Sequence, residues 1–430
     1  MKYLYRPHIL FLILLFSPYL VKDVPPFRDI RFDHILLLFM GLRIILSGKV
    51  FRSAEFIPFV LMFLIFLCST FISSISGTFS PSMALFINIV EWYGRGFIIL
   101  LFLKSSNMWF GEEEIIKLFR IVIFASVLIN VIALCQLISP FDQVVNPFLT
   151  RYYSGTFGNN QSYIYILMGQ GRAISILAQT GTAGLYALLV FSLLLFLGPN
   201  LLKMRKIVYG GLLAQSLVGG FLPLSKAFIL GVPIVLLIYC LRLNMTRIIK
   251  LGFIVLGLCI VAYGGLGYMN LQKHASYANG SVQMLASPDL IYAATFGPRF
   301  GEGSALDKTM DITKKNWLIG TGVVSGIRLC DSQWVPLLVF GGIIGLTYYI
   351  WYIITAVWPI IKRKGFIQRN VIAGRQILIF YLTIFFIYIL FGIGSPTFSQ
   401  DKTGDFFWIL TAVLSRLAIC RPSVYFYKGN

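Results

Sequence analysis

The chain has 430 residues, of which 58% are hydrophobic and only 12% are charged, and its mean hydropathy is +0.82. A soluble domain usually carries about 25% charged residues. The composition therefore excludes a soluble enzyme, a disordered chain and a collagen-like chain, and it indicates a protein that crosses a bilayer many times. The net charge of +20 at pH 7 is explained by basic cytoplasmic loops. No phosphate-loop or RNA-binding motif is present, so we expect no nucleic-acid partner.

Twelve apolar segments are candidate membrane spans, since a bilayer core needs about 20 apolar residues per helix. The predicted fold class is all-α, with residues 1–430 forming a single polytopic membrane domain. The first segment is preceded by basic residues as in a signal peptide, but it lacks a small-x-small cleavage site and is interpreted as an anchor. In chain order the expected spans are 7–21, 33–48, 54–75, 83–103, 116–139, 173–198, 206–223, 227–243, 249–268, 333–361, 374–396 and 405–420.

Charge predicts the orientation of these spans. The segment 362–375 contains five basic residues, whereas the segment 76–82 contains none. Basic loops favour the cytoplasmic side, so both termini are expected in the cytoplasm. This arrangement leaves two substantial outer loops, a periplasmic loop at 140–172 and a large periplasmic loop at 269–332. Chemistry or recognition is expected on this outer face.

The end of the larger loop suggests an anion site. Ser304 and Asp307 form a variant of the capping box, which predicts a short amphipathic helix over 304–316. Arg299 lies just before this helix. A helix N-terminus attracts anions, and arginine suits phosphate through its planar fork. Arg299 fits a solvated loop charge equally well.

A second group of residues leads from this loop into the tenth span. Gly320 and Gly322 are expected to bring backbone close to a ligand, because glycine has no side chain. Arg328 and Asp331 follow, and Asp331 stands directly before a long apolar run. Asp331 is interpreted either as a functional carboxylate or as a helix N-cap.

Charged residues also mark other membrane edges. Arg172 directly precedes the sixth span, and Lys226 is the basic residue of the short outer turn between spans seven and eight. Charges at a membrane edge are costly and often functional, although either side chain also fits one that snorkels to the interface. Glu91 and Arg95 are four residues apart on one expected helix and are interpreted as a structural pair.

The sequence gives no sign of a metal or a cofactor. The six cysteines are scattered without a Cys-x-x-Cys pair, and the three histidines are far apart. A zinc site or a disulfide framework is therefore not expected. No carboxylate cluster suggests a divalent cation site, so we expect no metal and no cofactor.

Together these features resemble the O-antigen polymerase family of bacterial inner-membrane proteins and, more distantly, the O-antigen ligases. Two departures from the family pattern matter. Lys226 stands where a Ser-Arg pair is usual, and His274 lies far upstream of the place where ligases carry a histidine, which favours polymerase over ligase. The resemblance is carried by Arg172, Arg299, Trp317 with Gly320 and Gly322, Asp331-Ser332, and the FGGIIG stretch from Phe340 to Gly345.

The resemblance implies a metal-independent membrane glycosyltransferase of lipopolysaccharide biosynthesis. It would join undecaprenyl-pyrophosphate-linked oligosaccharide repeat units at the periplasmic face of the inner membrane. Arg172 and Arg299, together with Lys226 and Arg328, would bind the pyrophosphate, since cations stabilise a leaving group that gains negative charge. Asp331 would be the base or the orienting acceptor for the attacking hydroxyl. Membrane lipid and a chain-length regulator protein are the other expected partners.

Two alternatives stay open. The first is an O-antigen ligase. The second is a transporter or flippase of lipid-linked sugars, because twelve spans with both termini inside suit a carrier. Against a carrier, no inverted repeat is visible, few charges lie within the expected spans, and the long polar loop is unusual.

Overall fold

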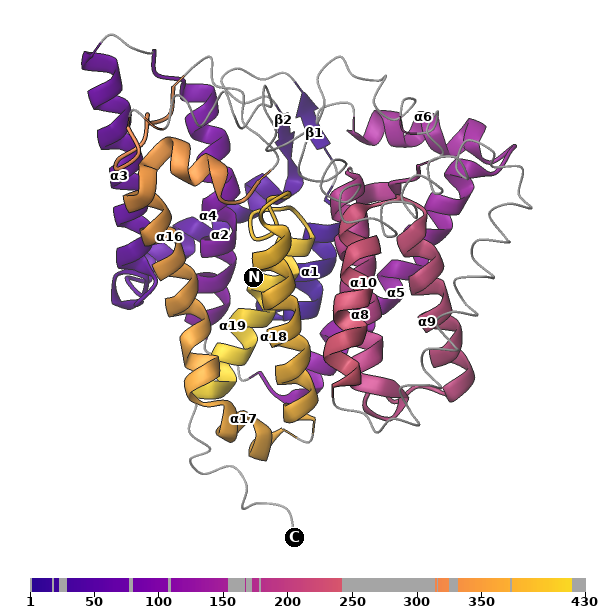
Figure 1. Ribbon diagram of the computed structural model, residues 1–430. Helices are drawn as coiled ribbons and strands as arrows, with labels where there is room; N and C mark the ends of the chain where they lie inside the picture. Colours follow the sequence, from indigo (N-terminus) through magenta and orange to yellow (C-terminus); the bar gives the residue numbers. More distant parts are fainter. Residues whose placement is uncertain are drawn as a thin grey trace.

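The computed structural model describes residues 2–17, 19–22, 29–76, 80–106, 110–153, 167, 172–177, 179–241, 314, 316–324, 332–371 and 373–419. Over these residues the chain forms a bundle of helices with one β hairpin at one end (Figure 1). Six of the described helices are long and apolar enough to cross a membrane. The prediction of a helical, multi-pass membrane protein is thereby confirmed at this level.

The helices follow the apolar segments of the sequence. The six long apolar ones are α3 (Phe56–Ile75), α4 (Met83–Ser105), α5 (Glu112–Leu137), α8 (Thr180–Leu201), α16 (Val335–Lys362) and α18 (Gly374–Phe391). Shorter helices are α1 (Pro7–Leu15), α2 (Phe32–Leu46), α6 (Asp142–Tyr153), α9 (Lys206–Phe221), α10 (Lys226–Cys240), α17 (Lys364–Asn370) and α19 (Thr403–Ile419). Three 3-10 turns complete the described elements: η1 (Lys2–Tyr5), η2 (Val50–Arg52) and η3 (Ser175–Leu177).

Eleven of the twelve predicted spans contain one of these helices, and the ninth, at 249–268, lies outside the described residues. The first span is shorter than predicted, because α1 ends at Leu15. Strand β1 (Tyr19–Lys22) follows and pairs antiparallel with β2 (Asp29–Arg31). Pro18 stands between α1 and β1 in the sequence, and proline disfavours a helical residue before it. The hairpin adds a short β element to the predicted all-α class.

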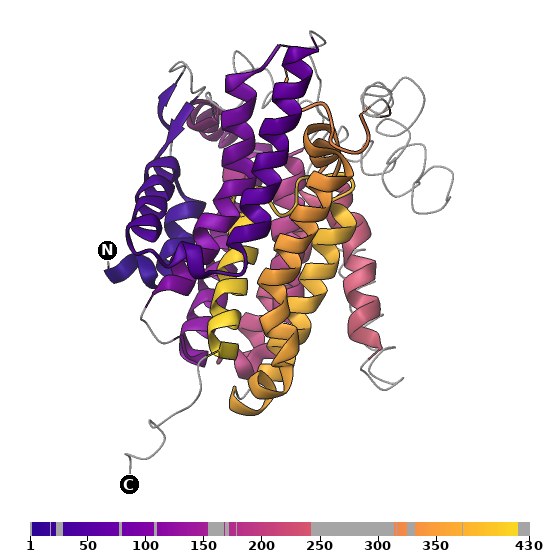
Figure 2. The same cartoon turned by 90° about the vertical axis from the view of Figure 1, so that its left-hand side faces the viewer.

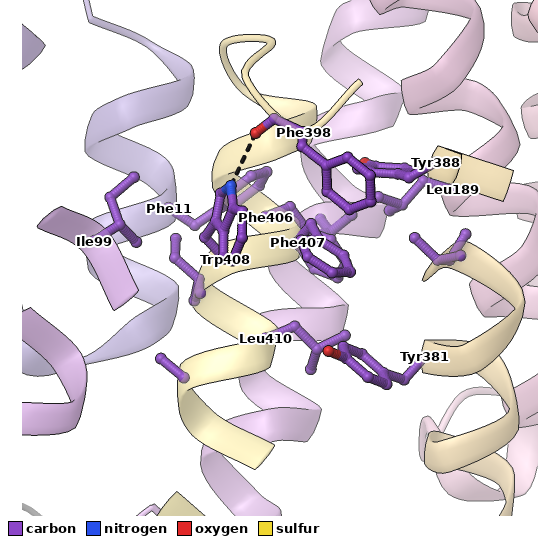
Figure 3. Close-up of a cluster of buried hydrophobic side chains, with 14 of the residues drawn as sticks. Phe11, Ile99, Leu189, Tyr381, Tyr388, Phe398, Phe406, Phe407, Trp408 and Leu410 are labelled. Carbon is purple, nitrogen blue, oxygen red and sulfur yellow. Dashed lines mark hydrogen bonds between the residues drawn. The ribbon is translucent and has the colours of Figure 1, made fainter. Parts of the chain in front are cut away.

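Helix α19 lies in the middle of the bundle and packs against α4, α16 and α1. Its aromatic side chains form the centre of a buried cluster (Figure 3). Trp408 Nε1 donates a hydrogen bond to Phe398 O at 2.8 Å, so the indole is buried without losing its polar partner. Gly96 of α4 faces Trp408 so closely that a Cβ atom there would lie 2.2 Å from Nε1. This glycine lets α4 and α19 approach each other.

Segments assigned to the outer side by the charge rule are gathered at one end of the bundle. Hydrogen bonds join Ser82 N to Val323 O at 3.1 Å, Ala173 N to Leu222 O at 3.0 Å, and Gln333 N to Gly392 O at 2.7 Å. The β hairpin and α6 lie at the same end, and α17 lies at the other (Figures 1 and 2). We call the first the hairpin end of the bundle. The side of the membrane that it faces stays a prediction.

Candidate functional site

The predicted cations are only partly within the described residues. Arg172 Nε donates a hydrogen bond to Pro223 O at 3.0 Å. Pro223 precedes by three residues Lys226, the first residue of α10. The structure therefore brings Arg172 to the turn that leads into Lys226, at the hairpin end.

The other predicted site residues lie outside the described part of the chain. These are Arg299, Arg328 and Asp331, and the predicted helix over 304–316 falls there too, except for Lys314 and Asn316. Their convergence with Arg172 therefore stays a prediction.

The segment 316–324 has a role that differs from the predicted one. Helix α16 is interrupted at Gly342, whose φ of 59° and ψ of −158° are not helical. Ile343 N donates to Trp317 O at 3.0 Å, and Ile344 N donates to Leu318 O at 3.2 Å. Carbonyl groups of this segment thus satisfy amide groups that the break would leave without a partner.

The two glycines of the same segment approach helices instead of a ligand. A Cβ atom on Gly320 would lie 2.5 Å from Val339 O in α16, and one on Gly322 would lie 2.2 Å from Thr70 N in α3. Both glycines have positive φ, 75° and 76°. Both glycines thus have a structural reason, which is the close packing of this segment between α3 and α16, and a role toward a ligand stays a prediction.

A small cavity lies beside Ala173 and Ser175, between α5, α8 and α9. Its volume is about 10 Å³, which is room for about one water molecule. A sugar or a diphosphate does not fit into a space of this size. This cavity is therefore not the substrate site.

The feature that stands out at the hairpin end is a buried ionic cluster. It joins three distant stretches of the chain, at 31–34, 91–95 and 401–405. Charged groups inside a membrane protein are costly and mark functional sites by default. The members of the ionic cluster are Arg31, Asp33, His34, Glu91, Arg95, Asp401, Lys402 and Asp405.

Arg95 lies in the most buried part of the cluster. Its Nε and Nη2 atoms donate to both carboxylate oxygens of Asp405, at 2.6 and 2.7 Å. Its Nη1 atom donates to Asp33 Oδ2. Arg95, Asp33 and Asp405 are almost fully buried. Such a forked pair is strong, because two charge-assisted hydrogen bonds form in one fixed geometry.

Arg31 links the buried part of the cluster to its more exposed members. Its Nη1 atom donates to Asp401 Oδ2, and its Nη2 atom donates to Glu91 Oε1 at 2.7 Å. Burial disfavours the charged guanidinium, but Asp401, Asp33 and Glu91 outweigh burial and raise the pKa of Arg31. Burial likewise disfavours the Asp401 carboxylate, yet Arg31 and Arg95 hold the pKa of Asp401 well below its usual range. Both groups therefore stay charged at neutral pH.

Lys402 connects the cluster to the segment that carries Arg172. Its Nζ atom donates to Ile176 O, and its backbone N donates to Asp405 Oδ2 at 2.9 Å. Burial lowers the pKa of Lys402 to about 8, although Asp401 acts in the opposite direction. The turn before α19 is thus fixed both to the ionic cluster and to η3, four residues after Arg172.

Sequence alone indicated only Glu91 and Arg95 from this cluster, as a pair on one helix. In the structure Glu91 contacts Arg31 and His34, while Arg95 contacts aspartates from other helices. The sequence did contain a signal for the rest of the cluster, since charged residues stand at the start of the second and the last predicted spans. Their association depends on tertiary contacts across 57 to 370 residues of sequence.

No protein-family model matches the chain, and no curated protein matches it. The residues at the hairpin end of the bundle therefore carry the functional proposal by themselves.

Proposed function

We propose that the protein is an O-antigen polymerase of a bacterial inner membrane, with both termini in the cytoplasm and the hairpin end of the bundle in the periplasm. It transfers a growing oligosaccharide from one undecaprenyl pyrophosphate to the next lipid-linked repeat unit. A chain-length regulator is its expected protein partner.

One observation carries this proposal. The hydrogen bond from Arg172 to Pro223 brings two cationic segments together at the hairpin end, one holding Arg172 and the other holding Lys226. The negative charge of a lipid diphosphate lies at the membrane edge. A basic side chain there stays partly hydrated, so it can bind the diphosphate without the cost of burying a charge in the bilayer. The same face lacks access to cytoplasmic ATP, so the energy of the reaction would come from the diphosphate bond of the donor.

The reaction needs few groups. A hydroxyl of the lipid-linked acceptor attacks the anomeric carbon at the reducing end of the growing chain. The bond between this carbon and the pyrophosphate oxygen breaks, and its electron pair leaves with undecaprenyl pyrophosphate. Arg172 and Arg299, supported by Lys226 and Arg328, stabilise that charge. Asp331 orients the acceptor hydroxyl or takes its proton.

Deletion of the gene and analysis of the cell's lipopolysaccharide on a gel test the proposal. A polymerase mutant leaves a single repeat unit on the core, whereas a ligase mutant leaves none. Complementation with Arg172→Ala or Arg299→Ala should also leave a single repeat. Arg369→Ala is a matched control, since Arg369 lies in α17 at the opposite end and should restore long chains. Long chains in both test variants contradict the assignment.

A carrier of lipid-linked sugars is the second candidate. Two observations favour it: the buried ionic cluster, and the interruption of α16 at Gly342. Intramembrane charge networks and broken helices are typical of transporters. A carrier mutant would accumulate lipid-linked repeat units on the cytoplasmic side, whereas a polymerase mutant would still deliver them to the periplasm.

A further inference from the structure

The ionic cluster has an uneven charge balance. Among the described residues it contains three basic side chains, Arg31, Arg95 and Lys402, and four carboxylates, those of Asp33, Glu91, Asp401 and Asp405.

The four carboxylates differ in the number of cations that they contact. Asp33 and Asp401 each contact both Arg31 and Arg95, and Asp405 is held by the fork of Arg95. Glu91 contacts one permanent cation, Arg31, and otherwise only His34. Among the described residues, both of its contacts use Oε1, so Oε2 keeps its capacity to accept a proton.

The imidazole of His34 orients Glu91. Its Nδ1 atom accepts a hydrogen bond from the backbone N of Arg31 at 3.4 Å, so a neutral imidazole has its donor at Nε2. Nε2 lies 2.8 Å from Glu91 Oε1 and donates to this oxygen. The Oε1 atom of Glu91 is therefore held by both His34 and Arg31.

The same pair lies at the accessible edge of the cluster. The side chains of Glu91 and His34 are 26% and 25% exposed, whereas that of Arg95 is 2% exposed. Deeper in the cluster, Asp33 Oδ1 is buried and accepts no hydrogen bond from the described residues, although Arg31 Nε lies 3.2 Å away. An unfilled buried acceptor calls for a donor such as a hydroxyl group.

We propose that Glu91, oriented by Arg31 and His34, is the proton acceptor for the sugar hydroxyl that attacks the donor. This inference rests on the proposed polymerase function and names its base, which leaves Asp331 to orient the acceptor. In the reaction the hydroxyl proton passes to Glu91 Oε2 while the new glycosidic bond forms, and the electron pair of the broken bond leaves with the pyrophosphate. The proton is then released to the periplasm.

Location supports this role. Lys402 joins the cluster to Ile176, and the backbone from Ile176 leads back to Arg172. A base and a diphosphate-binding cation on neighbouring segments are what a transfer between two lipid-linked substrates needs. Among the described residues, six charged groups surround the pair of His34 and Glu91, and they come from β2, α2, α4, the turn before α19, and α19 itself: Arg31, Asp33, Arg95, Asp401, Lys402 and Asp405.

Purified full-length protein in lipid vesicles, supplied with synthetic polyprenyl-pyrophosphate-linked repeat units, tests the proposal through the pH dependence of kcat. The wild type should lose activity as the base is protonated at acidic pH. Glu91→Gln should lower kcat about 100-fold or more, remove the acidic limb and leave KM within about threefold. His34→Gln keeps the Glu91 carboxylate but removes the imidazole beside it, so the acidic limb should shift. If His34 had only a structural role, the position of this limb would not change.

Glu113→Gln is the matched control. Glu113 is an exposed carboxylate at the opposite end of the bundle, paired with Lys117, and its loss should leave the pH profile unchanged. Glu91→Asp retains a carboxylate and should keep the acidic limb at reduced kcat, and formate should restore turnover to Glu91→Ala. These two variants keep the proposal falsifiable if Glu91→Gln folds poorly.

The outcomes separate this inference from the function on which it rests. A wild type that polymerises together with a Glu91→Gln variant of similar kcat overturns the inference alone. A Glu91→Ala variant that keeps the acidic limb and is not rescued by formate does the same. A wild type that does not polymerise overturns both, and proton-driven movement of the substrate across the vesicle would assign the cluster to a carrier.

Discussion

Arg95 and Asp405 form a forked ion pair in the interior of the bundle, although 310 residues separate them in the chain. The pair joins α4 to the first turn of α19 and makes the N-terminal and C-terminal parts of the protein one packed unit. Exchanging such a buried pair for apolar residues is often neutral, whereas removing one partner is costly.

Replacement of Arg95 should therefore lower the free energy of unfolding of the bundle. Arg95→Ala leaves Asp405 and Asp33 buried without their cation, and we expect a loss of about 3–5 kcal/mol in stability. Arg95→Lys should recover only part of it, because a lysine cannot make the forked contact. Thermal unfolding of the detergent-solubilised protein measures both. Equal stability of wild type and Arg95→Ala would contradict the buried pair.

Close packing of the segment 316–324 makes a second prediction. Gly322→Ala places a methyl group against the backbone of α3 at a residue with φ of 76°. We expect a loss of about 2–4 kcal/mol from overpacking and backbone strain. Gly210→Ala is the control, because this glycine lies within α9 with open space around it, and alanine should there stabilise by about 0.5–1 kcal/mol. Similar melting temperatures for the two variants would refute the packing.

Lys402 predicts a dependence of stability on pH. Its pKa is lowered by burial to about 8 from the model-compound value of 10.5. Between these two values the unfolded chain binds a proton that the folded protein has lost, so this group makes stability rise as pH increases. Lys402→Met lacks the group. The difference in melting temperature between variant and wild type should shift in favour of the wild type from pH 8 to 9.5, and a constant difference would refute the lowered pKa.

Orientation can be tested with cysteines at opposite ends of the bundle, in a background without the native cysteines. Val144 is 74% exposed in α6, and Lys364 is exposed in α17. We expect an impermeant maleimide to label Val144→Cys in intact spheroplasts and Lys364→Cys only after lysis. Labelling of both positions from the same side would contradict the arrangement of the spans.

Metal independence is the last prediction. Among the described residues no group of three or more histidine, cysteine or carboxylate side chains is arranged to hold a metal ion. We expect that the purified protein extends lipid-linked oligosaccharides equally well in EDTA and in magnesium. A requirement for magnesium in this assay would place a cation in the pyrophosphate site.

The sequence by itself determined the membrane class and the approximate bounds of most of the described helices, and it predicted which loops share one side. Hydropathy and the distribution of lysine and arginine are properties of consecutive residues, so no tertiary contact is needed to interpret them. The early end of α1 and the β hairpin were missed, because a short apolar stretch does not distinguish a helix from a strand.

Tertiary structure decided which of the described charged residues lie together. Arg172 and Lys226 were visible as charges at membrane edges, but their segments are brought together by tertiary contacts, from Arg172 to Pro223 and from Ala173 to Leu222. Glu91 was expected to pair with Arg95, four residues away, since that partner is the nearest in sequence. The fold instead gives each a partner on another element, because a buried charge is stabilised by the groups that packing places around it, and packing depends on the whole chain.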